Sequence, residues 1–333
     1  MGFRMRRSFS IVPGVRVNVS ARSMGLTVGG KYARTTINSR TGVHNSYSLP
    51  GTGLTYVTKT TRSSPRQRGT VKVVATPPPP VRTAPGVFAP RGEKHLYAAL
   101  AGGRFTDLET IASQHPELRR TCMVIDAFNT ADSPQTHRRV RGMFEELWRS
   151  GYVPERDDFL TRYAPGSTCV IGLAPGVSVT LPLHRTAVGL ALAELRQEDG
   201  DLAEAADLVE TLEPSLPAAA SLAELYGQLE RWEAVVELTE HVTERDELSL
   251  YLLIQRAAAF RELRHNDAAR DVLRTVLARR SAPVDLRHLA LLERGLTYAA
   301  DGKKAQARKD LDRILAEDGH FPGLAEAIAA LGT

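Results

Sequence analysis

The sequence predicts a multidomain α+β protein, with a small antiparallel β-meander at the N-terminus and then an all-α solenoid of repeated helix pairs with one inserted β-hairpin. Three observations predict this fold. The first 60 residues contain runs that alternate apolar and polar side chains, and four similar segments recur after residue 186. All 38 acidic residues lie after position 92, whereas the first 92 residues hold 15 of the 43 Lys and Arg. Such a charge asymmetry indicates separate modules with separate partners.

The N-terminal residues have the pattern of short strands. Val15, Val17 and Val19 alternate with polar residues, which is typical of a half-buried strand. Similar short runs, separated by Gly or Pro, occur at 8–11, 26–28, 33–37, 46–49 and 54–58. Five or six such strands predict an antiparallel meander. Because its apolar face is thin, we expect this sheet to need a partner surface.

A resemblance covers this first segment. The opening GFRMRR, the stretch VPGVRVNVSARSMGLTVGG at 12–30 and LPGTGLTY at 49–56 resemble the short bacterial module named domain of unknown function 4236. The resemblance spans about residues 1–57 and predicts a domain over 1–58, and only the middle of the segment is less glycine-rich than the family pattern. The family implies no known activity.

The basic residues of this module mostly occupy the polar alternate positions, with aromatic residues between them. A basic, aromatic sheet can bind single-stranded nucleic acid by backbone attraction and base stacking, or an anionic membrane surface. A solvated face, or docking on the acidic rear of the same chain, are the alternatives. The candidate polyanion contacts are Arg4, Arg6, Arg7, Arg16, Arg22, Lys31, Arg34 and Arg40.

A proline-rich basic linker is expected over residues 59–92. Four consecutive prolines, Pro77 to Pro80, favour a semi-rigid polyproline II spacer. The run VKVVA at 71–75 could add one more strand. The linker predicts that the sheet can move relative to the helical body.

Residues 93–185 are expected to form a helical domain of degenerate helix pairs. Ser133 and Pro134 have the residue types of an N-cap and first helical position, for a helix that runs through Trp148. Met143 belongs to the apolar face of that helix and is interpreted as a core residue. Residues 168–183 alternate around Pro175-Gly176 and predict a β-hairpin.

Four segments between 186 and 331 share one template. A small residue is followed by an aromatic or long residue, a polar or glycine turn, and a second small or aliphatic residue. The first positions are Ala193, Ala223, Ala257 and Gly295, at spacings of 30, 34 and 38. The template resembles the tetratricopeptide repeat, whose helix pairs recur near 34 residues. Residues 186–333 are therefore expected to form a tetratricopeptide-like domain, with Pro214, Pro217 and Pro283 ending helices between copies and 321–331 as a capping helix.

The resemblance to this repeat implies a groove lined by the first helix of each pair. Carrying the repeat register over places the groove at Glu194, Gln197, Glu224, Gln228, Tyr251, Ile254, Arg261 and Glu262. The family's clamp for a peptide carboxylate needs Lys, Arg and Asn, which these positions lack apart from one Arg. A basic or amphipathic protein segment fits better, and the chain's own basic front is one candidate. The other interpretation is that these side chains simply face water.

No catalytic, cofactor or metal motif is found in the sequence. Nine His are scattered, and neither HExxH, CxxC nor G-x-S-x-G occurs. The GLTVGGK run at 25–31 lacks the Ser or Thr of a phosphate loop, because Tyr32 follows it. Two isolated cysteines and no leader or membrane-spanning stretch make the cytoplasm the expected location. We therefore expect a non-enzymatic adaptor or scaffold that binds a protein partner; the alternative is a nucleic-acid-associated protein.

Overall fold

The computed structural model describes residues 84–131, 135–174, 177–243 and 246–332, and the backbone of six strands between residues 8 and 59. Side chains of 172–178 and of those six strands are outside this description. The chain divides into two compact units. We call residues 4–171 with 180–192 the N-terminal unit, and residues 193–333 with 172–179 the repeat unit.

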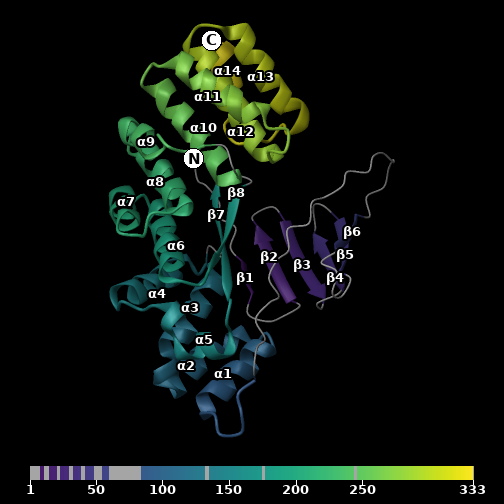
Figure 1. Ribbon diagram of the computed structural model, residues 1–333, viewed down its shortest axis with the longest axis vertical. Coiled ribbons are helices and arrows are strands. Elements are labelled where there is room, and N and C mark those ends of the chain that lie inside the picture. The colour runs from purple at the N-terminus through teal and green to yellow at the C-terminus, as the bar shows by residue number, and fades with distance from the viewer. Residues whose placement is uncertain are drawn as a thin grey trace. The chain divides into compact units, whose positions relative to one another are not determined.

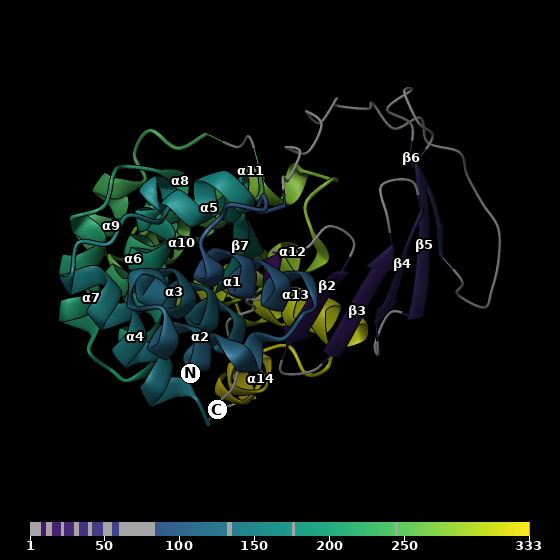
Figure 2. The same cartoon turned by 90° about the horizontal axis from the view of Figure 1, so that it is seen from below.

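Five strands of the N-terminal unit form an antiparallel sheet in chain order (Figure 2). Their bounds are β2 Val15–Ser20, β3 Ser23–Gly29, β4 Ala33–Asn38, β5 Gly42–Ser48 and β6 Thr55–Lys59. The register places Val17 opposite Leu26 and Tyr47 opposite Tyr56. This is the meander that the alternation predicts. The glycines of the GLTVGGK run also fit this sheet, since β3 covers the first five residues of the run.

The first predicted strand does not join that sheet. β1 (Ser8–Ser10) pairs antiparallel with β7 (Thr168–Ala174), and β8 (Val177–Pro182) lies on the other side of β7. A hairpin leaves one edge of each strand unpaired, and β1 satisfies the backbone groups along the edge of β7. The hairpin expected at 168–183 is therefore present and carries a third strand, while its Pro175-Gly176 turn lies outside the described residues.

The described part of the N-terminal unit also contains five complete α-helices. They are α1 Arg91–Ala101, α2 Leu108–Gln114, α3 Arg119–Thr130, α4 His137–Arg149 and α5 Asp158–Tyr163. The predicted start of α4 is wrong: the helix begins at His137 with Thr136 at the N-cap position, while Ser133 and Pro134 lie outside the described residues. The Thr136 side chain makes no capping hydrogen bond to α4, and its Oγ1 donates a 2.6 Å hydrogen bond to the carbonyl of Thr130 at the end of α3.

The repeat unit consists of consecutive helix pairs followed by a single last helix (Figure 1). The first helices of the pairs, called A helices here, are α6 Arg185–Glu198, α8 Leu216–Gln228, α10 Glu247–Glu262 and α12 Val284–Ala300. The second helices, called B helices, are α7 Leu202–Glu210, α9 Trp232–Leu238, α11 Asn266–Ala278 and α13 Lys304–Glu317, and α14 spans Leu324–Gly332. Only the last residues of α6, from Ala193, belong to this unit.

Prolines between the pairs start helices as well as separating them. Pro217 occupies the first turn of α8, behind Ser215, whose side chain accepts from the backbone N–H of Ala218. Pro283 is the N-cap residue of α12. Pro283 therefore lies between two helix pairs as predicted. The prediction is wrong for Pro217, which lies inside α8, because the first helical turn needs no backbone donor and tolerates proline.

The predicted turn position adopts one conformation in all four pairs. Gly200, Glu230, Arg264 and Gly302 have φ values of 87°, 58°, 65° and 71°. In each pair the next backbone N–H bonds to the carbonyl five residues earlier, at 2.7 to 2.9 Å. This is the Schellman ending, in which a left-handed residue lets the chain leave an α-helix with its carbonyls satisfied. The same bond joins Arg104 to Ala99 and Tyr152 to Leu147 in the N-terminal unit.

The small residues of the template lie where helices meet. Ala193, Ala223 and Ala257 on the A helices are fully buried. Gly295 takes this position in α12, where an added Cβ would come within 3.0 Å of Leu311 Cδ2 on α13. In α12 the small residue is thus explained by the close approach of this A helix to its B helix α13.

Candidate protein-binding surface

The A helices α8 and α10 are joined by a hydrogen-bonded carboxylate. Glu224 accepts from the Tyr251 hydroxyl at 2.5 Å, from Gln255 Nε2 at 3.0 Å and from Gln228 Nε2 at 3.1 Å. Burial raises the pKa of Glu224, although these three donors oppose the rise. Burial, together with the nearby Glu224, holds the pKa of the Tyr251 hydroxyl well above its ordinary value. Glu224 therefore has its acceptor capacity used by its own neighbours.

A second polar link joins α10 to α12. Arg261 donates from Nε and Nη2 to one carboxylate oxygen of Glu293, both at 3.3 Å, and from Nη1 to Glu262 at 2.5 Å. Burial raises the pKa of Glu293, while the Arg261 guanidinium opposes this change. The single arginine among the predicted groove residues is thus held between two carboxylates of its own domain.

Burial shows which of the predicted groove residues can reach a partner. Tyr251 and Ile254 are 0% and 1% exposed, so they are core residues and the prediction that they line a groove is wrong. Both residues lie on the side of α10 that packs against neighbouring helices. The repeat register alone does not distinguish this buried side from the side that faces the groove. Gln228 and Glu262 are exposed, whereas Glu194 and Gln197 are half-buried on α6. The A helices therefore offer fewer free polar groups than the sequence predicts.

Negative charge gathers on a different set of helices. Sixteen Asp and Glu but only three Arg lie between Glu194 and Glu247. On α7, the exposed residues Glu204, Asp207 and Glu210 are spaced by three, which places them along one side of a helix. On α9, Glu233 and Glu237 are exposed at a spacing of four. We call these five residues the acidic B-helix surface.

One residue of this surface is fixed from within the unit. Glu210 Oε1 accepts a 2.9 Å hydrogen bond from the Tyr226 hydroxyl on α8. Burial and this carboxylate raise the pKa of Tyr226 to about 12. The carboxylates of the other four residues are exposed to solvent, and their negative charge attracts cations and cationic segments.

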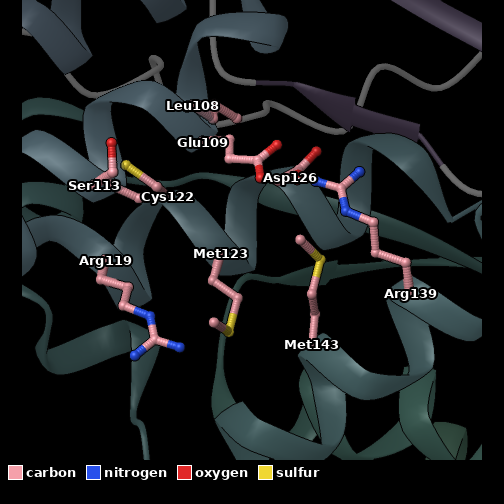
Figure 3. A pocket seen from close by; sticks show the side chains of 10 residues that line it. Leu108, Glu109, Ser113, Arg119, Cys122, Met123, Asp126, Arg139 and Met143 are labelled. Atoms are coloured by element: carbon pink, nitrogen blue, oxygen red, sulfur yellow. Dashed lines mark hydrogen bonds and ion pairs between the residues drawn. The ribbon is translucent and has the colours of Figure 1, made fainter.

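A pocket of about 290 Å³ lies in the N-terminal unit between α2, α3 and α4. Its lining is largely apolar, with two methionines at its centre (Figure 3). Glu109 and Asp126 lie close together at one side, where Arg139 reaches Asp126 in an ion pair. The ten lining residues are Leu108, Glu109, Ala112, Ser113, Arg119, Cys122, Met123, Asp126, Arg139 and Met143.

The pocket has the groups of a binding site and lacks an activated nucleophile. Burial raises the pKa of the Cys122 thiol to about 12, and the nearby Asp157 and Asp126 add to this. A thiol that stays protonated at neutral pH is a poor nucleophile. Burial also raises the pKa of Asp126, against the opposing charge of Arg139. Met143, interpreted as a core residue from its helical spacing, lines this pocket instead.

The candidate polyanion contacts of the front remain predictions. Arg16 and Arg34 lie on β2 and β4, but their side chains and the other six residues are outside the description. Within the described residues, no cluster of three or more His, Cys, Asp or Glu side chains could hold a metal ion. None of the described helices combines the length and apolarity needed to cross a membrane.

Comparison with known proteins identifies the front of the chain. Residues 3–57 match the family model "Protein of unknown function (DUF4236)". The resemblance of the N-terminal module is therefore confirmed. No curated protein matches the sequence.

The solved structures that resemble the chain include the following three. The N-terminal domain of the EccA1 ATPase from the ESX-1 secretion system of Mycobacterium tuberculosis is 15% identical, with a TM-score of 0.51 over 73% of this chain and 87% of that domain. BtubC from P. vanneervenii is 16% identical, with a TM-score of 0.43 over 72% and 92% of the two chains. A Podosopora anserina protein with TPR-like repeats is 18% identical, with a TM-score of 0.41 over 61% and 95%.

The first of these likenesses shows a shared fold and, at 15% identity, nothing of activity. The tetratricopeptide-like arrangement follows from the chain itself. Each of its four described helix pairs contains a Schellman turn of the same geometry, and the small residues of the template are buried.

Proposed function

We propose that this chain is a non-enzymatic adaptor whose helical repeats bind a protein partner through a cationic segment. The observation that carries the proposal is the acidic B-helix surface, where carboxylates outnumber basic groups and face solvent. The predicted A-helix groove contributes less, because Glu224 and Arg261 are engaged by neighbouring side chains. The basic N-terminal module would supply a second contact.

The partner chemistry follows from the spacing of the carboxylates. Residues three apart on α7 project from the same side, so a segment lying along this helix meets several negative charges in succession. Arginine suits such a surface best, because its planar guanidinium binds carboxylates through paired hydrogen bonds. We therefore infer an arginine-rich, extended segment as the recognised element.

A charge-reversal experiment tests this proposal. The variant Glu204→Lys/Asp207→Lys is titrated, as the full chain, with fluorescein-labelled nona-arginine, and binding is followed by fluorescence anisotropy. We expect affinity at least about 10-fold weaker than that of the unsubstituted chain. A loss also seen with the control below would contradict the proposal.

The matched control is Asp285→Lys/Glu326→Lys, which makes the same change of net charge at exposed positions of α12 and α14. Like Glu204, both control residues lie in the first turn of their helices, so the effect on helix dipoles is comparable. We expect the control to change affinity by less than about 3-fold, because the net charge of the chain acts only weakly at a distance in physiological salt.

A second candidate function rests on the front of the chain. Its 15 basic and no acidic residues favour nucleic acid as a ligand. An electrophoretic shift of single-stranded DNA by the full chain, strong at low salt and lost at high salt, is the expected signature. Failure to retain the oligonucleotide at low salt removes this candidate and leaves the adaptor proposal intact.

A further inference from the structure

An aromatic side chain stands fully in solvent ahead of α1. Phe88 is 101% exposed and its neighbour Val87 is 84% exposed. Other large apolar side chains of the described residues that reach solvent are at most about half exposed. Phenylalanine loses favourable burial free energy in this position, so this exposed pair is a candidate contact site.

Hydrogen bonds fix the backbone that carries these two residues. Residues 86–89 form a turn, closed by a 3.0 Å hydrogen bond from the backbone N–H of Ala89 to the carbonyl of Gly86. Lys94 Nζ, on the first turns of α1, donates to the carbonyl of Val87 at the tip of this turn. A residue on a fixed turn loses little backbone entropy when it binds, which favours association.

The same unit carries a pocket of matching character. Leu108, Ala112, Met123 and Met143 supply an apolar lining within about 290 Å³, a volume at the small end of ligand sites. Methionines adapt their shape to an inserted ring and make favourable sulfur–aromatic contacts. Aromatic anchors seated in such pockets are the typical hot spots of protein interfaces.

The charges around the anchor and the pocket are complementary. Arg91 is exposed three residues after Phe88. On the pocket side, Asp126 is paired with Arg139, and Arg119 with Glu146 at 2.9 Å. Glu109 is exposed at the pocket rim, and the described residues offer it no ion-pair partner. An approaching Arg91 would supply the missing positive charge.

We propose that Phe88 of one copy of this chain inserts into the pocket between α2, α3 and α4 of a second copy, with Arg91 facing Glu109. The anchor and the pocket are different surfaces of one chain, so two copies can exchange anchors reciprocally or associate head to tail. The proposal concerns self-association and is independent of the acidic B-helix surface, which lies in the repeat unit.

The test measures self-association of the full chain by sedimentation velocity across the micromolar range. We expect the unsubstituted chain to associate reversibly. Phe88→Ala and Ala112→Arg are each expected to weaken association by at least about 10-fold, through loss of the anchor and obstruction of the pocket respectively. Because Phe88 is fully exposed, its replacement leaves the packing of the chain unchanged.

Two controls match these variants. Gln114→Arg places the same charge on an exposed residue of α2 that does not line the pocket, and Leu315→Ala removes an exposed apolar side chain of α13. Both are expected to associate like the unsubstituted chain. A chain that stays monomeric at its highest concentration, or controls that lose association equally, would overturn the proposal.

Mixing the two variants supplies the sharpest outcome. The Phe88→Ala chain retains an intact pocket, and the Ala112→Arg chain retains an intact Phe88, so the mixture is expected to form one-to-one heterodimers. Their formation also shows that the Ala112→Arg chain is folded well enough to present its turn. A mixture that remains monomeric while each variant alone is monomeric would refute the pairing of this anchor with this pocket.

Discussion

The left-handed turn residue of the second helix pair offers a direct test of the repeat geometry. Glu230 has a φ of 58°, a region that costs a side-chain-bearing residue about 1–2 kcal/mol. Glycine avoids this cost, but its greater freedom in the unfolded chain offsets about 0.5–1 kcal/mol. The Glu230 carboxylate lies between the C-terminal end of α8 and the N-terminal end of α9, so the effects of the two helix dipoles on its charge oppose each other. Glu230→Gly should therefore stabilise the fold by about 0.5–1 kcal/mol.

Thermal or urea unfolding measures this change. A gain of about 1 kcal/mol raises Tm by roughly 2–4 °C in a domain of this size. The same substitution at Glu233, in the first turn of α9, should instead lower stability by about 1 kcal/mol, because the residue is helical. Gly200→Ala, at a φ of 87°, should also lower it by about 1 kcal/mol. Equal losses for Glu230→Gly and Glu233→Gly would refute the turn geometry.

Two further predictions concern charged residues of α12 and α13. Asp310 is 3% exposed and accepts two 2.7 Å hydrogen bonds from Arg294. Arg294→Leu should therefore lower the free energy of unfolding in urea by about 3–5 kcal/mol, and adding Asp310→Leu should restore most of that stability. No recovery in the double variant would contradict this prediction. Burial raises the pKa of Glu293 above its ordinary value of 4.5, so its contribution to stability is present below that value and is lost as pH rises through the raised pKa. Glu293→Gln should lack this part of the decline between pH 4 and neutrality, and an unchanged slope would exclude Glu293 as its source.

Much of the repeat architecture could be predicted from the sequence because packing restricts the residue types. Ala193, Ala223 and Ala257 must be small where A and B helices touch, and the turn residue must tolerate a left-handed backbone. Glycine at positions 200 and 302 indicates that left-handed conformation. Glu230 and Arg264 do not, and only the repeat register points to them. The signal thus lay in the spacing between copies more than in any one segment.

The binding residues were harder to predict, because burial depends on the third dimension. Register places Tyr251 on the presumed groove, but its hydroxyl is turned to Glu224 inside the helix stack. The pocket residues come from three helices that the sequence does not link, and Met143 has the spacing of a core residue. The exposure of Phe88 depends on a turn held by Lys94, which no local pattern reveals. The pairing of β1 with β7 joins segments about 160 residues apart.

Hydrogen–deuterium exchange of the full chain, with and without nona-arginine, tests the central claim most directly. The adaptor account predicts slower exchange in the first turns of α7 and α9 and in the turns that precede them. The helices α11 and α13 should exchange unchanged. Protection confined to those two helices, or to the N-terminal unit, would contradict the assignment of the acidic B-helix surface as the partner-binding element.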